Sequence, residues 1–152
     1  MDLPKRKPTR LKGYDYSQNG YYFVTICTHN KKCILSNIVG DDAHIVPSKY
    51  GIIVEKYISN IVGIDKYVIM PNHIHLIIKN DNGTMWASSP TQSISQQVKS
   101  FKTLVTKEIG YKIFQRSFHD HIIRGEKDYL KIWNYIDTNP LKWREDCFYC
   151  EE

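Results

Sequence analysis

The chain has 152 residues, of which 41% are apolar and 24% are charged. This length suits one compact domain, and the apolar share is too high for a disordered chain. No apolar run approaches the roughly 18 residues that a membrane-spanning helix needs, so we expect no contact with a membrane. The first residues begin basic but lead into no apolar stretch, which predicts no secretory signal and a cytoplasmic protein.

The charge balance is basic, with 21 Lys and Arg against 16 Asp and Glu. Such a balance permits a polyanionic partner without requiring one. Residues 1–19 hold a dense basic cluster, and we interpret them as an N-terminal arm before a single domain at 20–152. The arm either keeps the protein soluble or follows phosphates, and its candidate DNA-binding residues are Lys5, Arg6, Lys7, Arg10 and Lys12.

The chain has four cysteines, Cys27, Cys33, Cys147 and Cys150. In a reducing compartment we expect free thiols, because a domain of this length does not need a disulfide framework. The single Cys-x-x-C pair at the end of the sequence cannot complete a zinc site by itself.

The first part of the domain begins with a strand. Residues 21–28 form an aromatic and β-branched run. Two short apolar pieces at 33–35 and 44–46 flank Gly40-Asp41-Asp42 and indicate a small hairpin. Helical spacing begins after Ser48, a candidate N-cap, and predicts a helix with one face formed by Ile52, Ile53, Lys56, Tyr57 and Ile61.

The second part of the domain has two strands, a helix, a strand and a last helix. The apolar runs 64–70 and 73–79 flank Pro71-Asn72, which predicts a tight antiparallel hairpin. A helix follows at 94–109, with Ile94, Val98, Phe101, Leu104, Val105 and Ile109 on one face, and Gly110 ends it. A strand is expected at 117–124, and the last helix runs from 126 to 139, where Pro140 prevents continuation.

The order β-α-β-β-α-β-α predicts an α+β, ferredoxin-like split βαβ fold. In this plan one antiparallel four-stranded sheet carries helices on one face, and an extra C-terminal helix follows. Fold alone does not define function, because this architecture serves many chemistries and many binding modules.

The sharpest chemical feature is His73-Ile74-His75 inside an apolar strand. Side chains at alternate strand positions point to the same face, so both imidazoles project together. Two nitrogens on one face are half of a metal site. The second pair, His119 and His121, has the same spacing. Three interpretations are open: all four histidines assemble one zinc site, the second pair orients DNA, or the second pair only flanks the fourth strand.

The last helix supplies two further candidates. Tyr129, Ile132, Trp133 and Ile136 predict its apolar stripe, and Tyr135 and Asn139 share the rim of that stripe. A rim tyrosine is most often a packing residue. The functional interpretation is that Tyr135 is a nucleophile and Asn139 a third, oxygen ligand beside the histidines. A phenol is a poor nucleophile at neutral pH and needs a cation, here Mg²⁺ or Mn²⁺, although imidazole ligands lean toward Mn²⁺ or Zn²⁺.

Four segments of the chain resemble a known family. The run Met70-Pro71-Asn72-His73-Ile74-His75, within residues 67–78, looks like the HUH motif of single-tyrosine transposases of the insertion-sequence 200/605 type. Residues 10–16, 114–124 and 135–140 resemble the REP-associated branch of that family. The similarity spans nearly the whole chain, and several motifs in the right order are far more specific than one His-x-His.

The resemblance implies a metal-dependent endonuclease and strand transferase that acts on single-stranded DNA with hairpins. His73, His75 and Asn139 would hold the divalent ion, and Tyr135 would form a 5′-phosphotyrosine and release a 3′-hydroxyl. Family members act as monomers or homodimers. Further candidates for DNA contacts are Arg116, His119, His121 and Arg124.

Two alternatives from other classes remain open. The same domain could grip single-stranded nucleic acid without cutting it, which predicts binding that survives a chelator and the loss of Tyr135. It could also be a small zinc-dependent hydrolase with water as nucleophile, which predicts tightly bound zinc and no covalent adduct.

Overall fold

The computed structural model describes residues 20–80 and 93–149. Its centre is an antiparallel sheet of four strands in the order β4-β5-β1-β6, in which β1 and β5 are the inner strands. The bounds of the strands are β1 (Gly20–Cys27), β4 (Ile64–Ile69), β5 (His73–Asn80) and β6 (His119–Ile123). The inner strands are the first and third of the βαββαβ unit, as the ferredoxin-like prediction requires.

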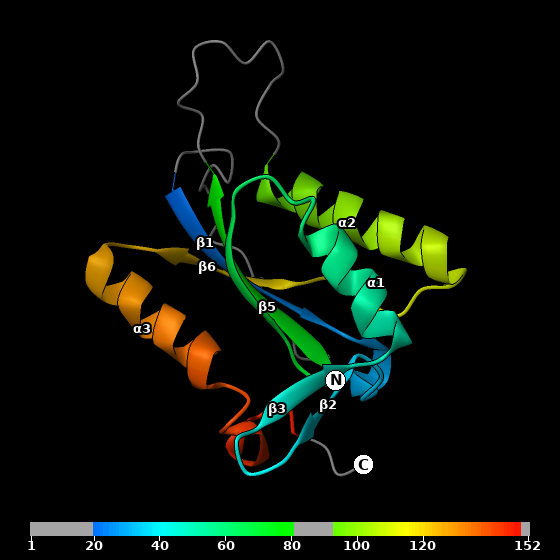
Figure 1. Ribbon diagram of the computed structural model, residues 1–152. Coiled ribbons are helices and arrows are strands. Elements are labelled where there is room, and N and C mark those ends of the chain that lie inside the picture. The colour runs from blue at the N-terminus through cyan, green and yellow to red at the C-terminus, as the bar shows by residue number, and fades with distance from the viewer. Residues whose placement is uncertain (1–19, 81–92, 150–152) are drawn as a thin grey trace, which may run out of the picture.

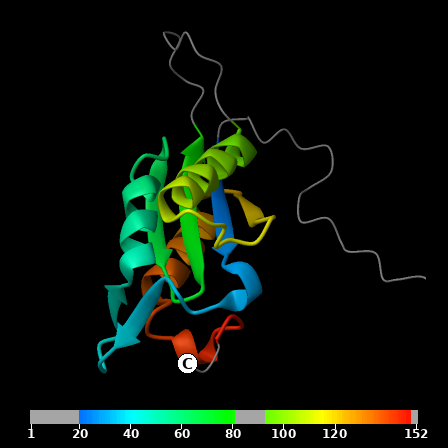
Figure 2. The same ribbon diagram turned by 90° about the vertical axis from the view of Figure 1, so that its right-hand side faces the viewer.

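Helices cover both faces of this sheet (Figure 1). The helices α1 (Lys49–Ile58) and α2 (Ile94–Ile109) lie side by side on one face, and α3 (Glu126–Thr138) lies on the other. Figure 2 views the molecule from the side of α1 and α2, with the sheet behind these two helices and α3 behind the sheet. The prediction of an α+β fold with an extra C-terminal helix is confirmed.

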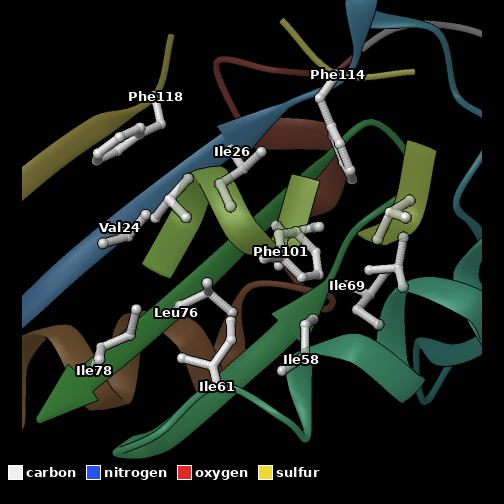
Figure 3. Packing of buried hydrophobic residues seen from close by; sticks show 14 of the residues in the cluster. Val24, Ile26, Ile58, Ile61, Ile69, Leu76, Ile78, Phe101, Phe114 and Phe118 are labelled. Atoms are coloured by element: carbon white, nitrogen blue, oxygen red, sulfur yellow. The ribbon is translucent and has the colours of Figure 1, made fainter. Parts of the chain in front are cut away.

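The main hydrophobic core lies between the sheet and the pair α1 and α2 (Figure 3). Alternate residues of the inner strands are fully buried there, such as Leu76 and Ile78 on β5. Ile58 of α1 and Phe101 of α2 meet them from the helical layer. A smaller apolar cluster on the other face includes Met70, Ile77, Ile123, Ile132, Ile136 and Trp143.

The helix boundaries follow local side-chain chemistry. The Ser48 side chain accepts a hydrogen bond from the Gly51 amide at the start of α1. Ser93 and Gln96 form a reciprocal capping box at the start of α2. Gly110 ends α2 with a φ of 99°, a left-handed conformation that glycine adopts at little cost.

The small hairpin differs from its prediction. Its strands are β2 (Ser36–Val39) and β3 (His44–Pro47), so residues 33–35 lie outside it. Leu35 is fully buried, and its carbonyl accepts hydrogen bonds from the Ser48 amide and hydroxyl. The apolar piece therefore anchors the start of α1 to the core instead of pairing as a strand.

Three apolar helix positions were placed wrongly by periodicity. Ile52, Leu104 and Trp133 were assigned to buried stripes but are 59%, 41% and 38% exposed. On α1 the buried residues are Gly51, Val54 and Ile58. A Cβ atom on Gly51 would collide with the Leu35 carbonyl oxygen, so this glycine permits the close approach that sets which side of α1 faces inward.

Two short 3-10 helices, η1 (His29–Lys31) and η2 (Trp143–Glu145), complete the described elements. No helix in residues 20–80 and 93–149 is long and apolar enough to cross a membrane. Cys27 and Cys147 carry free thiols as expected, whereas Cys33 is disulfide-bonded. The expectation of free thiols, which rested on a reducing compartment and the length of the domain, was wrong for Cys33, because a disulfide forms where the fold brings two cysteines within bonding distance.

Candidate metal and tyrosine site

The two histidines of the His-x-His pair lie together on β5. His73 and His75 occupy alternate positions, and their ring centroids are 4.5 Å apart. Both side chains face α3, on the opposite side of the sheet from Leu76. The rings are 0% and 2% exposed, so water does not solvate them.

A neighbouring side chain fixes one nitrogen of each ring. The amide nitrogen of Asn72 donates to the carbonyl of Phe148 at 2.7 Å, so its oxygen accepts a hydrogen bond from His73 Nδ1 at 2.8 Å. Thr25 Oγ1 forms a 2.8 Å hydrogen bond with Nδ1 of His75. The Nε2 atoms of both rings have no hydrogen-bond partner within the described part of the chain.

The loop after α3 brings oxygen atoms to the same place. Asn139, at the end of α3, is 2% exposed and donates from Nδ2 to Asp146 Oδ2 at 3.1 Å. Its own Oδ1 has no partner among residues 20–80 and 93–149. Asp146 Oδ2 lies 3.8 Å from His73 Nε2, a distance too long for a hydrogen bond.

These donor atoms fit a divalent cation. The ligand atoms of His73, His75 and Asp146 lie within 4.8 Å of one another. The two Nε2 atoms and Asn139 Oδ1 are buried lone pairs without partners, and a buried polar atom without a partner costs free energy. Two imidazoles, an amide oxygen and a carboxylate suit Mn²⁺ well, and Mg²⁺ through the oxygens.

Burial keeps both imidazoles neutral near pH 7. Desolvation lowers the pKa of His73 to about 4, although the carboxylate of Asp146 and the side chain of Asn139 act in the opposite direction. Burial and the neighbouring His73 hold the pKa of His75 well below its usual value. A metal binds only the neutral form of imidazole, so neither ring needs to release a proton first.

Tyr135 lies beside this cluster in the same chain. Its ring is 5.3 Å from that of His75 and 6.2 Å from that of Phe23, centroid to centroid. The residue is 41% exposed, so part of it is accessible to a substrate. Burial and the negative charge of Asp146 raise the pKa of Tyr135, and Asn139 partly opposes them. The phenol therefore needs a nearby positive charge to become a nucleophile.

The second histidine pair does not join the first. His119 and His121 lie exposed on the edge strand β6, and His121 Nε2 is 2.9 Å from Asp128 Oδ2. The only group of His, Cys, Asp or Glu within residues 20–80 and 93–149 that could hold a metal is His73, His75 and Asp146. The idea that four histidines assemble one zinc site was therefore wrong, because His119 lies two strands away from His75 in the register.

The remaining candidates for DNA contacts are spread over the chain. Arg116 and Arg124 are exposed, and the backbone amide of Arg124 donates to Asp128. The five basic residues assigned to the N-terminal arm, Lys5, Arg6, Lys7, Arg10 and Lys12, lie outside the described residues.

Asp146 was not predicted as a site residue from the sequence. It follows Asn139 by seven residues and belongs to no helix or strand, so no periodicity places it. Buried Trp143 and a hydrogen bond from the Phe148 amide to Asp146 Oδ1 (2.9 Å) position the carboxylate. The one available signal was Pro140, which ends α3 and makes the chain turn back toward the site.

Comparison with known proteins gives several relatives. A Haemophilus influenzae protein whose name states no function is 36% identical over 172 residues, covering 96% of this chain and 94% of that protein. A second H. influenzae protein, provisionally named a REP-associated tyrosine transposase, is 28% identical and covers 84% of this chain and 74% of its own length. The REP-associated tyrosine transposase of Escherichia coli K12 is 35% identical over 80 residues, which are 52% of this chain and 44% of that protein.

A solved structure has a similar fold. The structure of a REP-associated tyrosine transposase bound to a REP hairpin superposes with a TM-score of 0.61 at 23% identity. The match covers 93% of this chain and 74% of that one. No family model matches the chain.

Proposed function

We propose, from the premise that this chain belongs to the family of the REP-associated tyrosine transposases, that it cuts and rejoins single-stranded DNA next to hairpins. One observation carries the proposal. Three buried atoms without partners in the described residues, His73 Nε2, His75 Nε2 and Asn139 Oδ1, converge beside the accessible ring of Tyr135.

In this proposal His73, His75, Asn139 and Asp146 hold a divalent cation, Mg²⁺ or Mn²⁺. A cation bound there would withdraw charge from the scissile phosphate and favour the phenolate over the phenol. The hydrogen bonds that the two rings form with Asn72 Oδ1 and Thr25 Oγ1 would keep both rings in the orientation that the ion requires.

Tyr135 is the proposed nucleophile. Its phenol oxygen releases its proton to solvent and forms a bond to phosphorus, the bond from phosphorus to the 3′-oxygen breaks, and that oxygen takes up a proton from solvent. The products are a 5′-phosphotyrosine and a free 3′-hydroxyl. Attack by a 3′-hydroxyl on the phosphotyrosine reverses the step, so rejoining needs no ATP. Because Tyr135 contacts His75 of its own chain, we propose that one protomer contains a complete site.

The test uses single strands with a hairpin, labelled at the 5′ or 3′ end, and denaturing electrophoresis with Mg²⁺ or Mn²⁺. We expect a protein adduct that retains the 3′ label, because the fragment on the 3′ side of the cut stays bound to Tyr135. The adduct should be absent in Tyr135→Phe and in a chelator. Tyr129→Phe, six positions or about 1.7 turns earlier on α3, is the matched control and should still form it.

Other outcomes point to the alternatives. Cleavage without an adduct, in both the wild type and Tyr135→Phe, would identify water as the nucleophile and the protein as a hydrolase. Binding without cleavage across many hairpins would identify a nucleic-acid-binding module.

A further inference from the structure

A basic groove lies outside the metal and tyrosine site, along the outer side of α2. Its volume is about 960 Å³, and its cationic lining residues are Lys99, Lys102, Lys107, Lys112 and Arg116. A second hollow of about 590 Å³ shares Lys99, Lys102 and Arg116 with it and continues to Phe118. None of the described residues that line either hollow is acidic.

The two walls of the groove come from different segments. Lys99 and Lys107 lie eight positions apart on α2, and residues 112–118 run back beside the helix. Lys102 joins the walls, because its Nζ donates to the carbonyls of Gln115 (2.8 Å) and Ser117 (3.1 Å). This lysine holds the groove together, whereas Lys99 and Lys107 are exposed to solvent.

The single acidic residue of α2 faces away from the groove. Glu108 is 2.7 Å from Lys56 of α1 and accepts a hydrogen bond from Tyr57. The outer side of α2 therefore presents only positive charge. A surface with one sign of charge in a concave shape concentrates the opposite charge, which identifies a polyanion as its ligand.

We propose that this groove binds the phosphate backbone of the duplex stem of the hairpin, an inference that rests on the proposed function. Lys99 and Lys107 are about 12 Å apart along the helix axis, a span of about three to four phosphates on one DNA strand. Thr106 and Gln115 also line the groove, and their side chains are neutral polar groups of the kind that contact phosphates.

The aromatic residues of the groove indicate whether it binds the duplex stem or the single strand of the DNA. Phe114 and Phe118 line the hollows but are 8% and 6% exposed, because their rings fill the core. Unpaired bases bind by stacking on exposed aromatic rings, and the described lining offers none. The groove can thus bind a phosphate backbone, but its described lining offers no exposed aromatic ring on which unpaired bases could stack.

The groove is connected to the catalytic site through the end of β1. The Gln115 amide donates to the carbonyl of Cys27 at 2.8 Å, and Cys27 pairs with His73 in the sheet. Beyond Phe118 the chain enters β6, where His119 pairs with Thr25, the partner of His75. A stem in the groove would therefore lead its single strand over the edge of β6 toward Tyr135.

The test measures binding by fluorescence anisotropy in EDTA, with Tyr135→Phe as the background so that no cleavage occurs. The probes are a labelled DNA hairpin with a single-stranded extension and the extension alone. Lys99→Ala and Lys107→Ala should each weaken binding of the hairpin about threefold at about 100 mM salt, and together about tenfold. Each substitution should reduce the magnitude of the slope of log K against log[salt] by about one. Binding of the extension alone should not change.

The control is Lys49→Ala, which removes the same charge from an exposed position on α1. An equal effect of this control on the hairpin, or an equal loss for the extension alone, would overturn the groove proposal. So would a Tyr135→Phe protein that does not bind the hairpin. If the hairpin binds through Lys99 and Lys107 but the wild type forms no adduct, the groove stands and the proposed chemistry fails.

Discussion

The two faces of the sheet use the same strand for opposite purposes. On β5, Ile74, Leu76 and Ile78 enter a core in which apolar atoms meet apolar atoms. The alternate residues His73 and His75 face α3 and leave nitrogen atoms buried without partners in the described residues. The first face stabilises the fold, and the second keeps unsatisfied atoms in place, which makes it the face where a ligand would be bound.

The largest expected effect is on the apolar face. Leu76→Ala removes a fully buried side chain between β5 and the helices. We expect the free energy of unfolding to fall by about 3 kcal/mol, because the substitution leaves a cavity in a packed core. Urea unfolding measures this change. Leu130→Ala, at a position 55% exposed on α3, should change it by less than about 0.5 kcal/mol.

The next largest effect is the stabilisation of the protein by a metal ion bound at the polar face of the sheet. Mn²⁺ at about 100 times its dissociation constant should stabilise the wild type by about 2.7 kcal/mol, because it binds the folded state alone. His75→Ala should abolish this gain, which thermal unfolding with and without Mn²⁺ measures. A metal-dependent gain that survives in His75→Ala would place the ion elsewhere. Leu76→Ala should keep the gain although it starts from lower stability.

Strand alternation and helix spacing are local, so the sequence alone predicted that His73 would join His75 on one face and that Tyr135 would precede Asn139 by one turn. Asp146 was missed because tertiary anchors, and not periodicity, position it. The roles of Thr25 and Asn72 were also missed, since they depend on the register of β1 against β5 and on the turn at Pro71. Residue 52 was misplaced because helical spacing alone left two neighbouring faces of α1 possible.

A smaller effect concerns the hydrogen bond that orients His75. Thr25→Val keeps the shape of a side chain that is 5% exposed and removes the oxygen that meets His75 Nδ1. We expect Mn²⁺ affinity, measured by calorimetry, to fall about tenfold, as for other groups that orient a metal ligand. The matched control Thr103→Val, on the outer side of α2, should leave the affinity unchanged.

The smallest effect is the pH dependence of the metal-free protein. The pKa of His73 is lowered to about 4 in the folded state, against about 6.5 when unfolded, chiefly because the ring is buried. Between these values the unfolded chain binds more protons than the folded chain. The free energy of unfolding therefore contains no penalty from His73 above about pH 6.5, and it falls as the pH drops toward 4.

Between pH 7.5 and pH 5.5 we expect this histidine to remove about 1 kcal/mol from the free energy of unfolding. Urea unfolding in EDTA at the two pH values measures this difference in the free energy of unfolding. The difference should be smaller in His73→Gln. His44→Gln, at an exposed position on β3, should retain it. An equal pH dependence in His73→Gln would show that burial of the first histidine does not weaken the fold in acid. The two faces of the sheet would then differ less in their effect on stability than the burial of the two histidines predicts.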